Sequence, residues 1–167
     1  MSERGYAAIG FYHPKCLANV GGAFRAAHCY NAKLLLIQGQ RYRRASTDTP
    51  QAYRHIPLLR GTLKELIPYD CVPVAVDLVP GARSLHSYTH PERAMYIFGP
   101  EDSTLGTEIL SWCRDVIYIP MQGCSNLAAT VNVVLYDRSK KRQREERLLM
   151  ASAYSPLQQQ PEQQPSP

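Results

Sequence analysis

The sequence predicts an α/β protein with a mainly parallel sheet flanked by helices. Residues 7–12 and 33–37 are short apolar runs of strand length, and residues 19–30 carry apolar side chains at helical spacing. A strand, a helix and a strand in this order indicate two parallel strands joined by a crossover helix. Later apolar runs, each followed by small or polar residues, repeat this pattern and extend the prediction over most of the chain.

The first strand, helix and strand have recognisable ends. His13-Pro14 closes the first strand, because a residue before proline avoids the helical conformation. Asn19 is a favourable N-cap for the helix, which ends near Tyr30-Asn31. The apolar positions of this helix are Val20, Ala23, Phe24 and Ala27.

The middle of the chain is less regular. Residues 40–60 are rich in Arg, Thr, Pro and Tyr without a clear period, so we predict a basic loop with one short helix near Thr47. Residues 62–67 are predicted to form a short helix before Pro68. Further strands are predicted at residues 72–78, 95–98 and 116–119, and a helix capped by Ser103 is predicted at residues 105–113.

The final helix is predicted to begin within residues 125–127, capped by Ser125 or Asn126, and to reach Met150. Its apolar stripe consists of Leu127, Val131, Val134 and Leu135. After Met150 the composition shifts to Gln, Pro and Ser, which cannot form a core. We therefore predict a single domain over residues 1–150 and a disordered tail over residues 151–167.

The overall composition favours a globular protein with an anionic partner. Hydrophobic residues make up 44% and charged residues 20% of the chain, and no apolar run is long enough to span a membrane. The N-terminus lacks the apolar core of a signal peptide, so the expected location is cytoplasmic. The net charge of +5 favours nucleic acid as a partner. A basic cluster formed by Arg138, Lys140, Lys141, Arg142 and Arg144 is either part of that surface or a solvated helix face.

Cysteine and histidine usage predicts neither disulfides nor a metal site. The five cysteines (Cys16, Cys29, Cys71, Cys113 and Cys124) are an odd number and contain no CxxC pair, so reduced and mostly buried thiols are expected. The histidines have no metal-ligand spacing and are expected to be surface or hydrogen-bonded polar residues.

Three of the predicted strands end in loops of small or polar residues, at positions 78–81, 99–101 and 120–125. The carboxyl ends of parallel strands lie at one edge of a sheet, where ligands bind. The last loop leads into a helix N-terminus with unpaired N–H groups. The sequence contains neither G-x-G-x-x-G nor a P-loop, so these loops predict a small-molecule site other than a dinucleotide or nucleoside triphosphate site.

Three motifs resemble those of one enzyme family. Asn-Val-Gly-Gly-Ala-Phe-Arg at residues 19–25 resembles N-x-G-x-x-x-R, the first motif of the SpoU-type (TrmH-like) RNA ribose 2′-O-methyltransferases of the SPOUT superfamily. Residues 98–101 are similar to the second motif, an apolar strand followed by G-x-E. Residues 119–121 with residues 125–126 are similar to the third, I-P-M…S-x-N. Order and spacing agree over residues 6–144.

This resemblance implies a trefoil-knotted α/β fold, an obligate homodimer and S-adenosylmethionine bound in the knot. It implies methyl transfer to a ribose 2′-hydroxyl of RNA, and the short chain is most similar to the minimal single-domain members that methylate the wobble position of tRNA. The final helix would then form part of the dimer face. No metal is expected.

The resemblance assigns catalytic roles to three residues. Arg25 matches the arginine that activates the 2′-hydroxyl, whereas an exposed helix arginine in an ion pair is its structural alternative. Asn19 would position RNA or the arginine, although its capping role alone would explain it. Glu101 would accept hydrogen bonds from Asn19, Arg25 or the ribose, or would favour the dipole of a following helix.

The strand-end loops supply the expected cofactor residues. Gly99 and the loop containing Leu78 and Val79 would bring backbone close to the cofactor. The remaining candidates surround the third motif, and for two of them, Ile119 and Leu127, a role in the core is an equally good explanation. These candidates are Ile119, Met121, Cys124, Ser125, Asn126 and Leu127.

The expected RNA-binding residues are Arg25 and the cluster Arg41, Arg43 and Arg44, which Tyr42 interrupts. Such a cluster combines charges for phosphates with a ring for stacking on bases.

One departure from the family pattern supports an alternative. Cys124 stands where the family has serine, and the third-motif loop is shorter by about three residues on the alignment that matches Asn126. The alternative is a knotted RNA-binding protein without catalytic activity. A small-molecule enzyme on a doubly wound sheet is disfavoured by the missing phosphate motifs and the basic charge.

Overall fold

The computed structural model describes residues 5–39 and 52–154. The strands are β1 (Tyr6–Tyr12), β2 (Leu34–Gln38), β3 (Leu58–Arg60), β4 (Val72–Val76), β5 (Arg83–Ser84), β6 (Arg93–Phe98) and β7 (Asp115–Tyr118). The helices are α1 (Leu17–Cys29), α2 (Gly106–Leu110) and α3 (Leu127–Tyr154), with short 3₁₀ helices η1 (Ala52–Arg54) and η2 (Leu85–Ser87).

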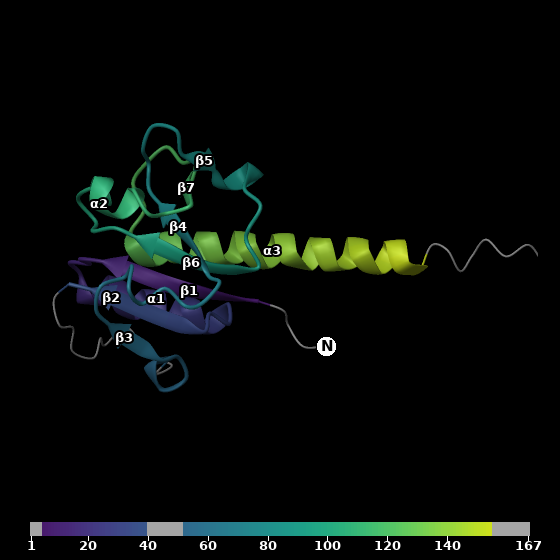
Figure 1. The fold of residues 1–167 in the computed structure, drawn as a ribbon, viewed down its shortest axis with the longest axis horizontal. Helices are drawn as coiled ribbons and strands as arrows, with labels where there is room; N and C mark the ends of the chain where they lie inside the picture. The colour runs from purple at the N-terminus through teal and green to yellow at the C-terminus, as the bar shows by residue number, and fades with distance from the viewer. Residues whose placement is uncertain (1–4, 40–51, 155–167) are drawn as a thin grey trace, which may run out of the picture.

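The strands form one seven-stranded sheet in the order β3-β2-β1-β6-β4-β7-β5, and every neighbouring pair is parallel. This confirms the predicted α/β class. In β1, Ala8 pairs with Leu34 of β2 on one side and with Met95 of β6 on the other. Figure 1 shows that α3 continues well past the edge of this sheet. The trefoil knot stays a prediction.

Alternating side chains of the strands cover the two faces of the sheet. Ile9 and Phe11 of β1 belong to a core shared with α1 and α3, whereas Ala8 belongs to a second core shared with α2. The predicted stripe of α3 lies in the first core, where its four residues are at most 6% exposed. The period of two in the strands therefore separates the two layers.

Close packing of α1 against α3 depends on a glycine. A Cβ atom added to Gly22 would lie 2.8 Å from the Cβ of Ala128, which is closer than two carbon atoms can approach without a shift. Gly22 of the first motif thus has a packing role, because it allows α1 to lie against the first turn of α3.

The sequence predicted the N-cap of α3 correctly but not the N-cap of α1. Asn126 caps α3, since its Oδ1 accepts a hydrogen bond from the N–H of Ala129 at 2.8 Å. Asn19 is not the N-cap of α1, because the helix begins at Leu17 and Cys16 holds the cap position. The N–H groups before α1 are satisfied from elsewhere in the fold, as described for the site below.

Other predicted boundaries were wrong. Residues 62–67 form a turn instead of a helix, and the short strands β3 and β5 were not predicted. The helix predicted at 105–113 is limited to α2, and Ser103 does not cap it. Strand β4 ends at Val76 instead of Leu78. Helix α3 continues past residue 150 to Tyr154, and the helix predicted near Thr47 lies outside the described residues.

The cysteines are free, as expected, but most are not buried. Cys71 is buried, Cys113 is half-buried, and Cys16, Cys29 and Cys124 are exposed. Burial raises the pKa of the Cys71 thiol to about 11. Within residues 5–39 and 52–154, no three His, Cys, Asp or Glu side chains gather as a metal site, and no helix is long and apolar enough to cross a membrane.

One member of the predicted basic cluster is buried in a polar network beneath α3. Arg138 is only 5% exposed and donates hydrogen bonds to the carbonyl oxygens of Tyr6, Pro91 and Glu92 and to the hydroxyl of Tyr96. The interpretation of Arg138 as part of a solvated or anion-binding face was therefore wrong. It extends the buried stripe of α3 by one more turn and ties the helix to strand ends.

His90 continues this network in its neutral form. Its Nε2 lies 2.9 Å from Oδ2 of Asp137, and its Nδ1 lies 2.6 Å from the hydroxyl of Tyr96. A carboxylate only accepts hydrogen bonds, so Nε2 carries the proton and Nδ1 accepts from Tyr96. Burial lowers the pKa of His90 to about 4, against the opposing effect of Asp137. The imidazole therefore stays uncharged near neutral pH.

We expect the stability of the fold to fall in mild acid because of His90. Between the unfolded pKa of 6.5 and the folded pKa of about 4, the unfolded chain binds a proton that the folded chain does not. The free energy of unfolding should then drop by about 2 kcal/mol from pH 7 to pH 5. Urea unfolding at both pH values measures this drop. A His90→Gln variant should lack most of it, and an equal drop in both proteins would contradict the assignment.

Candidate active site

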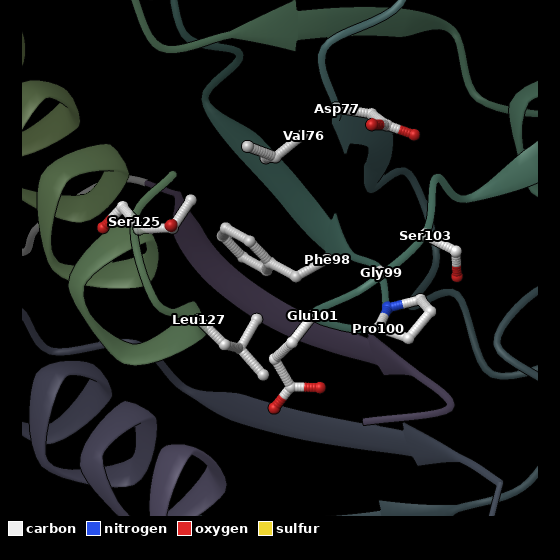
Figure 2. A pocket seen from close by; sticks show the side chains of 10 residues that line it. Val76, Asp77, Phe98, Gly99, Pro100, Glu101, Ser103, Ser125 and Leu127 are labelled. Atoms are coloured by element: carbon white, nitrogen blue, oxygen red, sulfur yellow. The ribbon is translucent and has the colours of Figure 1, made fainter. Parts of the chain in front are cut away.

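A pocket of about 130 Å³ lies where β4 and β6 end and α3 begins. Strands β4 and β6 are neighbours, with Val76 opposite Phe98, so the loops that follow them start side by side. Figure 2 shows the lining residues, which come from the last residues of β4 and β6, from the loops after these strands and from the start of α3. They are Val76, Asp77, Phe98, Gly99, Pro100, Glu101, Ser103, Ser125, Leu127 and Thr130.

Glu101 connects this pocket to the start of α1. Its carboxylate accepts hydrogen bonds from the backbone N–H of Lys15 at 3.0 Å, the backbone N–H of Cys16 at 3.2 Å and Nδ2 of Asn19 at 2.9 Å. Partial burial opposes the charge of Glu101, but these hydrogen bonds outweigh it and hold its pKa below the ordinary value. Glu101 is thus ionised at neutral pH and fixes the first turn of α1.

The structure brings together two of the three predicted catalytic residues. Asn19 and Glu101 are in direct contact, as the resemblance implied, and Glu101 is too far before α2 to serve its dipole. Arg25 lies later on α1, is exposed, and is not among the residues that line the pocket. Its place on the same helix means that Glu101 positions the segment from which Arg25 extends.

Of the predicted cofactor residues, Gly99, Ser125 and Leu127 line the pocket. The others lie around it: Leu78 is 77% exposed, Ile119 packs against the core, and Asn126 caps α3. The remaining three, Val79, Met121 and Cys124, are half-buried or exposed and are not lining residues. The basic cluster Arg41, Arg43 and Arg44 lies outside the described residues.

Asp77 lines the pocket and was not predicted from the sequence. Its Oδ2 accepts a hydrogen bond from the backbone N–H of Leu105 at 2.7 Å. The predicted strand ran two residues too far and thereby included Asp77, although a charged residue at the end of a buried apolar run is itself a signal for the strand end. The same bond replaces the Ser103 cap that the sequence suggested for the next helix.

The charges of the pocket favour a ligand that is not strongly anionic. Two carboxylates, Asp77 and Glu101, are among the lining residues, and none of these residues is lysine or arginine. The nearby ammonium of Lys15 is held by Asp102 at 2.5 Å, on the exposed side of the loop. A phosphate in this pocket would meet negative charge without a compensating side chain. Val76, Phe98 and Leu127 supply an apolar wall beside these acceptors.

The fold is that of known RNA methyltransferases. The SpoU methyltransferase AviRb from Streptomyces viridochromogenes, in complex with the cofactor AdoMet, matches with a TM-score of 0.74 and 18% identity over 85% of this chain and 60% of that chain. The TrmH/SpoU tRNA modifying enzyme of A. aeolicus matches with a TM-score of 0.75 and 16% identity, over 86% and 79% of the two chains. The chain thus spans about 60% of the length of AviRb.

A third structure, which concerns the 2-OH methylation of C/U34 on tRNA, matches over most of both chains. Its TM-score is 0.71 and its identity 24%, over 83% of this chain and 97% of that chain. No curated protein matches the sequence. These likenesses define an α/β fold of the SpoU methyltransferase type.

The profile of the SpoU rRNA Methylase family matches residues 7–136. The chain belongs to this family, as the three motifs predicted.

Proposed function

We propose that this protein is an S-adenosylmethionine-dependent methyltransferase that acts on the ribose 2′-hydroxyl of RNA, with tRNA as the preferred substrate. The observation that carries the proposal is the contact between Glu101 and the start of α1. It joins a pocket at the strand ends to the helix that bears Asn19 and Arg25, so a methyl donor in this pocket and an RNA bound at α1 would meet beside one carboxylate. The likeness to a structure concerned with tRNA methylation supports the choice of tRNA.

The chemical character of the lining residues suits S-adenosylmethionine, and a pocket of about 130 Å³ would enclose part of this molecule. Apolar side chains of Val76, Phe98 and Leu127 suit the flat base of a nucleoside, and the two carboxylates suit hydroxyl groups and positive charge. When bound, the cofactor supplies a methyl group activated by a sulfonium. The absence of basic side chains among the lining residues agrees with a donor that carries no phosphate.

Each catalytic residue has a role that its position supports. Arg25 would hold an RNA phosphate and lower the pKa of the 2′-hydroxyl by its positive charge. Glu101 fixes the position of the start of α1 relative to the pocket through its three hydrogen bonds. Asn19 donates one of these hydrogen bonds from within α1 and so links the helix itself to Glu101. Alignment of the two reactants supplies most of the rate in such a reaction, since well-oriented reactants react far faster than free ones.

Transfer of a labelled methyl group tests the proposal directly. The full-length protein is incubated with labelled S-adenosylmethionine and either bulk tRNA or ribosomal RNA, and the labelled nucleoside is identified by mass spectrometry. We expect a 2′-O-methylated nucleoside from tRNA. Label in ribosomal RNA alone would contradict the substrate, and label on a base would contradict the ribose hydroxyl as acceptor.

Replacing Arg25 by alanine should lower the rate of methyl transfer by about 100-fold, as expected for loss of a charge that assists proton removal. The affinity for S-adenosylmethionine should stay within about twofold, because Arg25 does not line the pocket. Single-turnover kinetics and calorimetry measure the two quantities. Arg144→Ala, an exposed arginine on α3, is the matched control. Full activity of the Arg25 variant would remove Arg25 from the mechanism.

A second candidate is an RNA-binding protein without methyl transfer. The exposed third-motif loop favours it, because Met121 is 46% exposed and Cys124 is also exposed, so neither closes over the pocket. Calorimetry with S-adenosylmethionine separates the candidates. Binding of the cofactor supports the enzyme, whereas no heat at saturating cofactor, together with retained tRNA binding, supports the second candidate.

We further propose a homodimer in which α3 forms part of the contact. Val133 and Tyr136, three residues apart on α3, are 39% and 55% exposed, so an apolar patch is present on the helix. Light scattering would measure the mass. A monomer at micromolar concentration would contradict this part of the proposal.

A further inference from the structure

Asp77 is an anchored carboxylate with one oxygen available to a ligand. It directly follows β4, at the carboxyl end of a central strand, and it lines the pocket. Its Oδ2 is engaged by the N–H of Leu105 at 2.7 Å, while its Oδ1 accepts no hydrogen bond from any residue in the described part of the chain. The bond to Leu105 limits rotation of the side chain, so the second oxygen is held in place before a ligand arrives.

The two carboxylates of the pocket have different tasks. In Figure 2, Asp77 and Glu101 extend toward opposite sides, with Phe98 and Gly99 between them. Both oxygens of Glu101 are already occupied by donors from the start of α1, which leaves little capacity for a ligand. Asp77 is therefore the lining carboxylate with the larger capacity to accept a hydrogen bond.

The side on which Asp77 lies decides which part of the ligand it meets. In the proposed function, methyl transfer would take place beside α1, because Asn19 and Arg25 belong to that helix. In that arrangement the methyl-bearing sulfur would be held near Glu101, and the nucleoside would be held near Asp77. The sugar of a nucleoside can donate hydrogen bonds to a carboxylate only through its ribose hydroxyl groups. An acidic side chain near the end of a parallel strand binds ribose hydroxyls in other nucleotide-binding folds.

We propose that Asp77 accepts a hydrogen bond from a ribose hydroxyl of the bound cofactor and thereby selects a ribonucleoside over a deoxyribonucleoside. This inference rests on the proposed use of S-adenosylmethionine. A hydrogen bond to a charged acceptor contributes more than one between neutral groups, and leaving the carboxylate unpaired in the pocket adds a desolvation cost. Loss of the hydroxyl should therefore weaken binding by about 10-fold or more.

Calorimetry with S-adenosylhomocysteine and its 2′-deoxy and 3′-deoxy analogues tests the inference without any turnover. Wild-type protein should bind at least one deoxy analogue about 10-fold more weakly than the parent. Asp77→Ala should bind the parent about 10-fold more weakly and should no longer distinguish it from that analogue. Asp102→Asn, which alters an exposed carboxylate that does not line the pocket, should keep the wild-type ratio.

The ratio of the affinities for parent and analogue within one variant separates loss of the ribose contact from displacement of the loop at Leu105. A displaced loop would lower both affinities alike. Asp77→Asn gives a second check, because its amide oxygen still accepts from Leu105 while the charge is gone. In this variant the ratio of the affinities for the parent and the deoxy analogue should fall to about 3-fold, the value for a neutral hydrogen bond.

Three outcomes would overturn the inference. The first is a wild-type protein that binds both deoxy analogues as tightly as the parent. The second is an Asp77→Ala variant that keeps the wild-type ratio. The third is a variant that loses S-adenosylmethionine but not S-adenosylhomocysteine, because Asp77 would then act on the sulfonium charge. Failure of the proposed function is distinct, since wild-type protein would bind neither parent ligand.

Discussion

Replacing Arg138 by alanine is expected to lower the free energy of unfolding by about 3 kcal/mol, because several hydrogen bonds from a charged donor and the packing of its buried stem are lost together. The guanidinium is the hydrogen-bond donor for the carbonyl oxygens of Tyr6, Pro91 and Glu92 and for the hydroxyl of Tyr96. Without it, the buried hydroxyl of Tyr96 and three partly buried carbonyl groups lose this donor. Urea unfolding at one fixed protein concentration measures the change.

Arg144→Ala provides the control on the same helix, because Arg144 is exposed and the substitution removes the same atoms. Its effect should stay below about 0.5 kcal/mol. A similar loss in both variants would mean that helix propensity, and not the buried network, determines the effect. Arg138→Lys should recover only part of the loss, since an ammonium has three donors in a different geometry.

Replacing Glu101 by glutamine should reduce methyl transfer by about 100-fold, the loss that a displacement of about 1 Å in a reacting group can produce. Three donors point at the carboxylate, from Lys15, Cys16 and Asn19. An amide offers only one accepting oxygen, and its NH₂ group would face at least one of these donors. The first turn of α1 must then shift, and it carries Asn19 and Arg25 with it. Single-turnover methyl transfer to tRNA measures the loss.

Asp102→Asn is the control for this prediction. Asp102 neighbours Glu101, but within residues 5–39 and 52–154 its carboxylate pairs with the exposed ammonium of Lys15 alone, and an exposed ion pair contributes little. Methyl transfer should change by less than about threefold. If both substitutions reduce the rate of methyl transfer equally, the rate depends on negative charge in the loop and not on the specific contact between Glu101 and α1.

The connection through Glu101 also explains why the motifs lie far apart in the sequence. Glu101 and Asn19 are separated by 82 positions, yet their side chains are 2.9 Å apart. Strands β1 and β6 are adjacent and parallel, so the loops after them open at the same edge of the sheet. A carboxylate after one strand thereby controls the helix that follows the other.

Local patterns were sufficient for the strands and helices of the core. The strands β1, β2, β6 and β7 and the stripe of α3 follow from continuous apolar runs and helical spacing, because burial on one or both faces imposes these patterns. The cap at Asn126 also follows from local chemistry, since its side chain bonds within one turn. The family motifs could also be identified from the sequence, because each consists of residues close together in the chain.

Contacts between distant segments could not be predicted in this way. The N-cap of α1 lies three residues earlier than predicted, at Cys16 instead of Asn19. Glu101, which is distant in the sequence, accepts hydrogen bonds from the N–H groups of Lys15 and Cys16 just before this helix. The strands β3 and β5 have three and two residues, so they depend on pairing with their neighbours and show little pattern of their own.

The sequence by itself determined the class of fold, the order of its main elements and the family. The tertiary structure decided which polar side chains are buried and what they bind. Arg138 was indistinguishable in sequence from the exposed Lys140 and Arg144, and Asp77 from a strand residue. The physical reason is that a charged side chain is buried only where distant partners satisfy it. Those partners, the carbonyl oxygens around Arg138 and the N–H of Leu105, become neighbours only after the sheet has formed.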